Sequence, residues 1–361
     1  MGVPLYRTLP GTDSRVRYLQ KLRKSGITAC FGAAFYDCND GEAGETYGGH
    51  IVTSNGSTLD QNGERPFNVG SVTKVITASL LIKLAETGEL TLDDPVARFV
   101  PAYRHAATTI RHLMTHTSGL QWTTPWKWPR PEELDACRAA IYASELAELP
   151  ELNAVYCTQG YLILMDVIES VTSGQRLEHF AREVLFEPLG MKHTTFIVTD
   201  WEPGSYSLPY DVQNLAPDSS LEGLAATGES GLYATPGDLI RFAAMLLEGG
   251  VYGGKTIFSE AAVQAMLSES TDGRFAKTAV FWSKGSRDRY GCFGDLLSPS
   301  AVGHPGFSGC MLMVDPGLGK AGVLVTNSQL LHADWTYYRR LWNLFAGLPA
   351  EGVRAEGAGH V

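Results

Sequence analysis

Apolar and polar residues follow different patterns at the two ends of the chain and in its middle. Near the N-terminus, residues 13–24 have apolar positions at helical spacing, and residues 27–36 form an apolar, aromatic run that is typical of a strand. Turn residues at 37–45 and a second run at 46–52 predict a returning strand, and so a hairpin. The C-terminal hundred residues contain three strand-like runs, at residues 279–283, 309–314 and 321–326. A turn at 316–319 joins the last two runs, and a final amphipathic helix is predicted at 334–345.

Helical patterns dominate the middle of the chain. Ser71 opens one of them and Gly88 ends it. Further helical segments follow at residues 110–115, 131–149, 159–172, 177–184, 236–247 and 259–266. This order predicts an α/β (α+β) fold, in which an antiparallel sheet is built from both chain ends, flanked by helices, and interrupted by a mostly helical inserted region. We expect residues 1–66 and 236–361 to form the sheet domain and residues 67–235 the helical domain, with the active site at their interface.

Composition limits the possible partners. The 361 residues are 44% hydrophobic and 19% charged, which is ordinary for a folded enzyme. A formal net charge of -10 without a cluster of Lys and Arg argues against nucleic acid or an anionic membrane surface as a partner. No apolar run is long enough to span a bilayer and no signal-peptide core is found, so we expect a cytoplasmic protein. Without any Cys-x-x-Cys pair, six cysteines are expected to be reduced thiols: Cys30, Cys38, Cys137, Cys157, Cys292 and Cys310.

The candidate chemistry begins at Ser71 and Lys74, which form the single Ser-x-x-Lys of the chain. Residues three positions apart share one face of a helix, so the amine can lie beside the hydroxyl. A serine hydroxyl becomes a good nucleophile when a neighbour takes its proton, and lysine can do so only if its pKa falls from about 10.4 toward 7 through burial or a second cation. The alternative is that Ser71 caps the helix and Lys74 is solvated, because the tetrapeptide is short.

Longer stretches around this tetrapeptide resemble one family. Residues 67–101, FNVGSVTKVITASLLIKLAETGELTLDDPVARFVP, are similar to the nucleophile helix and following loop of serine hydrolases related to class C β-lactamases and penicillin-binding proteins. Three more stretches follow in the family's order: TIRHLMTHTSGL at 109–120, FEPLGMKHTTF at 186–196 and GESGLYATPGDL at 228–239. The resemblance extends from about Gly32 to Ser328 and favours the catalytic interpretation of Ser71.

The resemblance also implies roles for later residues. Tyr156 opens the second motif of the family and would move the proton between Ser71 and the leaving group, with an adjacent cation lowering the pKa of its phenol. His304-Pro305-Gly306 stands in the place of the third motif. The oxyanion hole would combine the backbone N–H groups of Ser71 and Phe307, and Gly306 would let that strand approach closely.

Two positions depart from the antibiotic-processing members of this family. Thr158 replaces an asparagine whose amide can hold a substrate amide, and His304 replaces a lysine that would carry a fixed positive charge. Both changes fit esterases and transacylases better than β-lactamases or D,D-peptidases. Trp122 and Trp126, in the loop at 121–129, could form an acyl or acceptor pocket or pack against the helical region.

Two other motifs are interpreted as structural. Residues 249–256 match the phosphate-loop pattern, but they follow a helix and not a buried strand. His112 and His116 have zinc-ligand spacing, yet Leu113 stands where a metalloprotease has its general-base glutamate, and no metal is expected.

The sequence therefore predicts a two-step acyl transfer through an acyl-enzyme on Ser71. The partners would be a small-molecule ester, thioester or amide as acyl donor, and water or a nucleophilic acceptor, without a cofactor. A β-lactamase or D,D-peptidase is the rival within enzymes, and a catalytically silent scaffold is the rival outside them.

Overall fold

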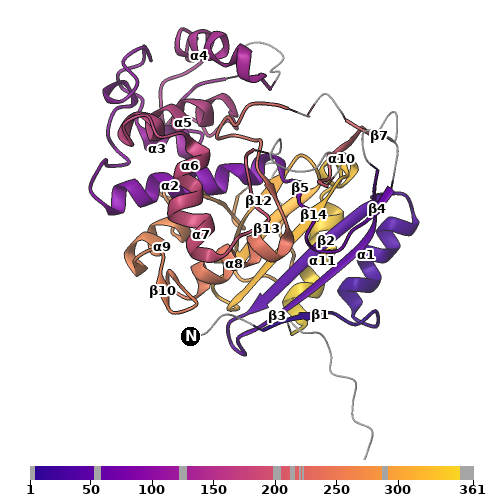
Figure 1. Cartoon of the computed structure of the whole chain (residues 1–361). Coiled ribbons are helices and arrows are strands. Elements are labelled where there is room, and N and C mark those ends of the chain that lie inside the picture. The colour runs from indigo at the N-terminus through magenta and orange to yellow at the C-terminus, as the bar shows by residue number, and fades with distance from the viewer. Residues whose placement is uncertain are drawn as a thin grey trace, which may run out of the picture.

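The computed structural model describes residues 5–52, 58–121, 128–197, 205–211, 216–218, 221, 223–286 and 292–349 (Figure 1). Its main sheet has eight strands in the order β1-β3-β2-β14-β13-β12-β11, with β4 paired to β3. The strands are β1 (Leu5–Thr8), β2 (Cys30–Asp37), β3 (Glu42–Val52), β4 (Thr58–Asp60), β11 (Trp282–Ser283), β12 (Val302–Gly306), β13 (Cys310–Asp315) and β14 (Lys320–Thr326). β14 pairs with β2 and so joins the two chain ends. Apart from the parallel pair β1 and β3, neighbouring strands are antiparallel, and the expected fold class is confirmed.

Helices cover both faces of the sheet (Figure 1). They are α1 (Ser14–Lys24) and α11 (Thr336–Gly347) on one face and α8 (Pro236–Leu247) on the other. Side chains of a strand point alternately to opposite faces, and in β2 both sets are apolar. Phe31 and Phe35 join the cluster that contains residues of α1 and α11, whereas Ala34 and Tyr36 join the larger cluster that contains residues of α8. This burial on both faces explains why the run at 27–36 has no polar alternation.

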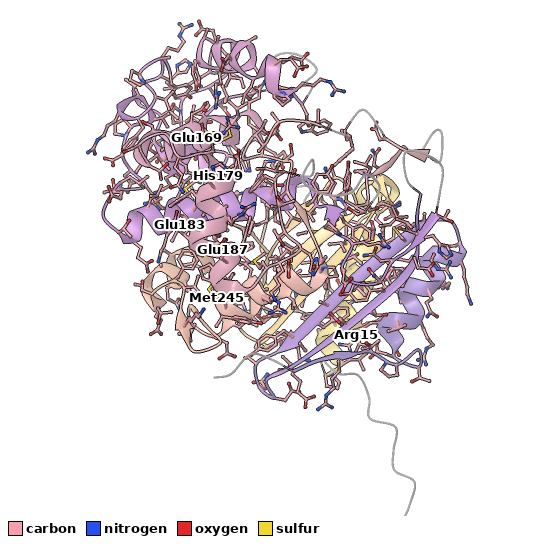
Figure 2. All side chains as sticks on the ribbon, in the orientation of Figure 1. Arg15, Glu169, His179, Glu183, Glu187 and Met245 are labelled. Carbon is pink, nitrogen blue, oxygen red and sulfur yellow. The ribbon has the colours of Figure 1, made fainter. Side chains whose placement is uncertain are left out.

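Arg15 is a buried charge in the layer between α1 and the sheet. Asp13 caps α1, accepts a hydrogen bond from the backbone N–H of Arg15, and pairs with its guanidinium at 2.8 Å. The guanidinium carbon also lies 4.6 Å from the centre of the Phe35 ring. Figure 2 shows Arg15 beside the sheet, away from Glu169 and His179 in the helical part of the molecule. A buried charge needs such a partner, so this pair fixes the start of α1.

The helical part of the molecule lies beside the α8 face of the sheet (Figure 1). Its elements are the 3-10 turns η1 (Gly70–Val72), η2 (Val96–Arg98) and η3 (Pro131–Glu133), the helices α2 (Thr73–Glu86), α3 (Ile110–Met114), α4 (Leu134–Tyr142), α5 (Gln159–Val171), α6 (Leu177–Ala181), α7 (Glu187–Leu189) and α9 (Glu260–Leu267), and the π turn η4 (Arg182–Phe186). The short helix α10 (Gln329–Ala333) follows β14 outside this part, and its Leu331 joins the cluster that contains residues of α1 and α11. Short two-stranded pairs link these segments: β5 (Phe67–Asn68) with β8 (Tyr233–Ala234), β6 (Tyr210–Asp211) with β7 (Ala216–Pro217), and β9 (Val251–Tyr252) with β10 (Lys255–Thr256). No helix within the described ranges is both long and apolar enough to cross a membrane. The division into domains at residues 66 and 235 stays a prediction.

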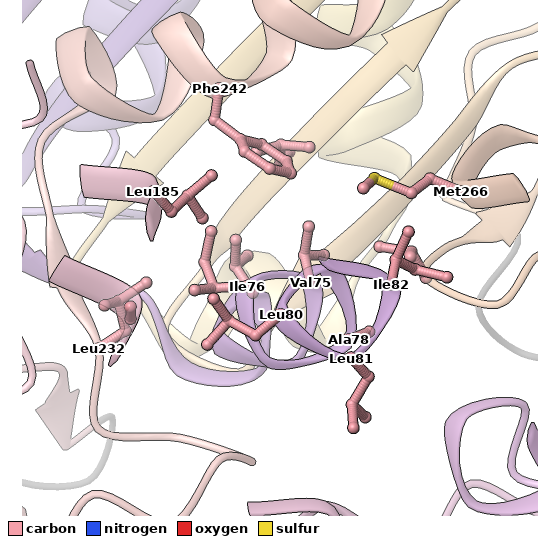
Figure 3. Close-up of a cluster of buried hydrophobic side chains, with 14 of the residues drawn as sticks. Val75, Ile76, Ala78, Leu80, Leu81, Ile82, Leu185, Leu232, Phe242 and Met266 are labelled. Atoms are coloured by element: carbon pink, nitrogen blue, oxygen red, sulfur yellow. The ribbon is translucent and has the colours of Figure 1, made fainter. Parts of the chain in front are cut away.

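α2 is buried on all sides, which fixes the residues at its start. Figure 3 shows Val75, Ile76 and Leu80 of α2 in a cluster with Phe242 of α8 and Met266 of α9. A helix that is apolar all round belongs in a core, and packing of this density leaves it little freedom to shift. Any side chain in the first turn of α2 is therefore held on a rigid support.

Two expected elements are shorter in the structure than the sequence pattern predicts. The helix expected at 131–149 ends at Tyr142, because the following residues pair with the segment at 119–120 through the Ala147 N–H and the carbonyl of Gly119. The strand expected at 279–283 is reduced to β11. The Thr278 hydroxyl accepts the N–H groups of residues 280 and 281 and turns the chain there.

Candidate active site

Ser71 and Lys74 lie side by side at the start of α2. Ser71 is in the turn η1, and Lys74 is in the first turn of the helix that follows. The Lys74 Nζ donates a hydrogen bond of 3.2 Å to the Ser71 Oγ. Thr73 ties this turn together, because its hydroxyl donates to the Gly70 carbonyl at 2.6 Å. The geometry expected from the Ser-x-x-Lys spacing is thus present.

Burial changes the acidity of Lys74. Its side chain is completely buried, and its Nζ also donates to the backbone carbonyl of Glu229 at 2.8 Å. Burial lowers the pKa of Lys74 to about 8, although the Glu229 carboxylate, 4.0 Å from the Nζ, opposes this shift. A lysine can act as a base only if its pKa is lowered, and burial lowers the pKa of Lys74 in this way. A substantial fraction of this amine is neutral near pH 8.

Tyr156 reaches the same serine from the segment that precedes α5. Its hydroxyl donates a 2.9 Å hydrogen bond to the Ser71 Oγ, across 85 residues of sequence. The expectation that a cation would lower the pKa of this phenol is wrong. Burial raises the pKa, the hydrogen bond with Ser71 opposes the rise, and the negative charge of Glu229 adds to it. The phenol is therefore protonated in the resting site and acts as a donor.

The third motif forms the end of β12, against the chain that leads into η1. His304 is buried, and its Nδ1 lies 2.8 Å from the Pro305 carbonyl oxygen, which can only accept a hydrogen bond. A side chain at Gly306 would overlap the carbonyl oxygen of Val69, so this close approach requires glycine.

The Phe307 N–H lies close to the serine turn. Gly70, with φ +54°, brings the turn so near that a Cβ there would lie 3.1 Å from the Phe307 nitrogen. The N–H groups of Ser71 and Phe307 are thus on two segments in contact, as an oxyanion hole requires.

Of the three residues predicted to bind substrate, only Thr158 lies within the described residues. Thr158 is buried before α5, and its side chain forms a hydrogen bond with the Tyr156 phenol that lowers the phenol's pKa. Its role in substrate binding stays a prediction. Trp122 and Trp126 lie outside the described residues. Trp128, in the same loop, packs against Phe307 with ring centres 5.5 Å apart.

His116, for which the sequence pattern predicts a structural role, is a neighbour of the site. Its backbone φ is +60°, in the left-handed region, where histidine is among the more frequent non-glycine residues. The Val155 N–H donates to its carbonyl at 3.0 Å, and the Cys157 N–H donates to its Nδ1 at 3.3 Å. His116 therefore anchors the residues on both sides of Tyr156, and its ring centre lies 4.6 Å from the phenol ring.

A neutral His116 is required for this contact, since a protonated Nδ1 cannot accept. Burial holds the pKa of His116 well below its usual value, and the charges of Lys277 and Lys74 add to this effect. Lys277 itself is buried, with its Nζ 3.5 Å from the Trp282 ring centre. The sequence pattern did not single out Glu229, Lys277 or Trp282. Glu229 could have been noticed within GESGLYATPGDL, where it is the single acidic residue before Asp238.

Other reactive side chains near the site are less suited to nucleophilic chemistry. All six cysteines are free thiols, as expected. Burial raises the pKa values of Cys157 and Cys310 to about 11, which disfavours their thiolates.

Among the residues that the structure describes, no group of three His, Cys, Asp or Glu side chains could hold a metal ion. His112 contacts Glu151 at 3.1 Å, and the phosphate-loop-like residues form the hairpin of β9 and β10.

Comparison with known proteins assigns the chain to a family. A model of the Beta-lactamase family matches residues 19–346, and the chain belongs to this family of serine hydrolases related to class C β-lactamases and penicillin-binding proteins. The curated Penicillin-binding protein 4 of Amycolatopsis lactamdurans is 29% identical over 354 residues, which cover 91% of this chain and 89% of that protein. The resemblance seen in the sequence is thus confirmed.

Two solved structures share the fold at low sequence identity. One is EstCE1, described as a hydrolase with promiscuous acyltransferase activity, with a TM-score of 0.74 and 17% identity over 92% of this chain and 99% of that chain. The other is simvastatin synthase (LovD) from Aspergillus terreus, with a TM-score of 0.70 and 17% identity over 92% of this chain and 97% of that chain. At this identity the similarity shows the fold alone.

Proposed function

We propose that the protein is an esterase or transacylase that forms an acyl-enzyme on Ser71 with a small-molecule ester, thioester or amide. The observation that carries this proposal is the convergence of two groups on one oxygen: the Lys74 Nζ at 3.2 Å and the Tyr156 hydroxyl at 2.9 Å from the Ser71 Oγ. A nucleophile with a base and a proton donor in hydrogen-bond reach is the arrangement that covalent catalysis requires.

In the first step, the Ser71 Oγ attacks the carbonyl carbon of the donor and its proton passes to the neutral amine of Lys74. The negative charge on the carbonyl oxygen is stabilised by the N–H groups of Ser71 and Phe307. When the bond to the leaving group breaks, the leaving oxygen, sulfur or nitrogen takes a proton from the Tyr156 hydroxyl. The Lys74 ammonium returns that proton to Tyr156, so the site is neutral again.

In the second step, water or an acceptor alcohol or amine attacks the acyl-enzyme. Its proton passes to the neutral amine of Lys74, the ester bond to Ser71 breaks, and the serine oxygen takes a proton from the Tyr156 hydroxyl. The Lys74 ammonium then returns its proton to Tyr156. Water makes the reaction a hydrolysis, and another nucleophile makes it a transfer. Thr158 and His304 support substrates other than β-lactams, since neither supplies the amide or the fixed charge of the antibiotic-processing members.

Intact-mass measurement after incubation with p-nitrophenyl acetate tests the proposal. We expect p-nitrophenol release together with a mass increase of one acetyl group at Ser71, absent in Ser71→Ala. A fluorophosphonate probe should label the same serine. If neither reagent modifies Ser71, the protein is a silent scaffold and the proposal is wrong.

A D,D-peptidase or β-lactamase is the second candidate, because of one observation. Lys277 is a buried cation close enough to His116 to lower its pKa, and a cation on this side of Tyr156 could receive a substrate carboxylate. The name of the Amycolatopsis relative points the same way. Rapid nitrocefin hydrolysis or stable penicillin labelling of Ser71, lost in Lys277→Gln, would favour this candidate over the first.

A cytoplasmic location and the absence of nucleic-acid or membrane partners remain part of this proposal. The six free thiols suit a reducing compartment.

A further inference from the structure

An apolar cavity begins next to the reactive serine. Gly70, which precedes Ser71, and Ser230, which follows Glu229, both line it, and so does Phe307 of the expected oxyanion hole. The cavity is narrow, because the space that it offers to water-sized groups is about 30 Å³. Because these three residues are neighbours of the groups that surround the Ser71 Oγ, an acyl group bound to that oxygen has direct access to this space.

The described walls of the cavity are mainly apolar, and Asn68 and Ser230 are their polar members. Trp128, Phe196, Leu221, Leu224 and Tyr233 supply most of its large side chains. None of the described residues that line it is Asp, Glu, Lys or Arg. A charged group in such a space would lose its hydration without gaining a partner, whereas an apolar group would lose contact with water at no such cost.

A wider groove at the surface adjoins the cavity. Trp128, Leu221 and Leu224 line both spaces. Ala136 and Ala140 of α4 add small side chains to the groove, and its rim carries Arg130, Glu132, Glu133 and Asp218. The shared side chains lie between the two spaces, so a chain longer than the cavity has to pass them to reach the groove.

We infer that this cavity holds the acyl group of the donor, and that the acyl group is neutral, apolar and several carbons long. The inference rests on the proposed acyl-enzyme at Ser71. It adds the substrate class: esters or thioesters of medium-chain or branched fatty-acid type, with the carbonyl at Ser71 and the hydrocarbon between Phe307, Trp128 and the two leucines.

A series of p-nitrophenyl esters tests the inference, with acyl chains of two, four, six and eight carbons and, as a charged match for the hexanoate, the mono-ester of adipic acid. Each buried methylene can contribute up to about fourfold in transition-state binding. We expect kcat/KM to rise at least about tenfold from acetate to octanoate, and the adipate ester to be at least about tenfold poorer than the hexanoate.

Two variants locate the effect in the cavity. Leu224→Trp fills the passage and should lower the octanoate-to-acetate ratio of kcat/KM at least about tenfold. Leu149→Trp makes the same exchange at a side chain that is 72% exposed and outside the cavity, and should leave the ratio unchanged. If Leu224→Trp does not fold, Leu221→Ala gives the opposite test, since it enlarges the cavity and should move the preferred chain toward longer esters.

The possible outcomes separate this inference from the proposed function. If esters acylate Ser71 but kcat/KM is flat or falls with chain length, or if the adipate ester matches the hexanoate, the cavity is not the acyl site although the serine chemistry stands. If no ester of the series acylates Ser71, the proposed function fails, and this inference fails with it.

Discussion

The two sides of Ser71 differ in chemistry. On one side lie Lys74, Tyr156 and the carbonyl of Glu229, all within a hydrogen-bonded network. On the other side lie Phe307 and Trp128, whose rings pack together and line a mainly apolar cavity. The polar side acts on bonds that every acyl donor has in common, whereas the apolar side contacts the part in which donors differ. Changes on the polar side should therefore slow all substrates, and changes on the apolar side should alter the ratio between substrates.

The largest effect is expected for Ser71→Ala. Removal of the nucleophile eliminates the acyl-enzyme, and kcat/KM for every ester should fall by about 10⁴-fold or more. Ser79→Ala is the matched control, because Ser79 is a buried serine of the same helix whose hydroxyl donates to the Val75 carbonyl. Steady-state ester hydrolysis checks both variants. Residual acylation of the Ser71→Ala protein at another residue would show that the polar side has been assigned to the wrong nucleophile.

Tyr156→Phe should have the next largest effect. The ring remains but the proton donor is lost, so kcat should fall about 10²- to 10⁴-fold for all chain lengths alike. Tyr161→Phe removes a phenol of α5 that donates to the Met114 carbonyl, and should cost about 1 kcal/mol of unfolding free energy with activity retained. A chain-length-dependent loss in Tyr156→Phe would contradict the separation of the two sides.

The pH dependence of acylation should report Lys74. The amine acts as a base only when it is neutral, and burial has lowered its pKa to about 8. The rate should therefore rise with pH and reach half of its maximum near pH 8, with the same profile for acetate and octanoate. Lys74→Arg should remove the activity. Lys83→Arg is the control, because Lys83 is on the same helix but pairs with Glu86, and this variant should keep the pH profile. A single-turnover pH series makes the measurement, and a profile that is flat between pH 6 and pH 9 would argue against Lys74 as the base.

The sequence predicted the parts of the site that depend on local geometry. Ser71 and Lys74 are three residues apart in one helical turn, so their contact follows from helix geometry. Tyr156 and His304 are remote in sequence, and they were found only through family resemblance. Glu229 was not predicted because it is 155 residues from Lys74, and its motif does not show that its carbonyl and its carboxylate both lie near the Lys74 amine.

Tertiary contacts explain the predictions that were wrong. The raised pKa of Tyr156 results from burial, and the sequence motif contains no information on how deeply the phenol is enclosed. The helix expected at 131–149 has a helical pattern throughout, but its last residues pair with the segment at 119–120. In both cases a contact between distant segments outweighed a local rule.

The smallest effect on the polar side is expected at His116, which touches Tyr156 but no reacting atom. His116→Leu removes the acceptor for the Cys157 N–H and places a side chain without local hydrogen bonding at a positive φ. A small displacement of the phenol should lower kcat about tenfold, with KM nearly unchanged. Parallel measurement of kcat and KM for acetate and octanoate checks this split.

His116→Asn is the conservative variant that separates positioning from stability. Asparagine tolerates a positive φ, and its Oδ1 can accept the Cys157 N–H in place of the imidazole nitrogen. It should restore kcat to within about threefold of the original value. If asparagine and leucine lower kcat equally while the melting temperatures also agree, then the hydrogen bond does not position Tyr156. If instead either variant changes the octanoate-to-acetate ratio, His116 influences the apolar side as well, and the two sides of Ser71 are coupled through the ring of Tyr156.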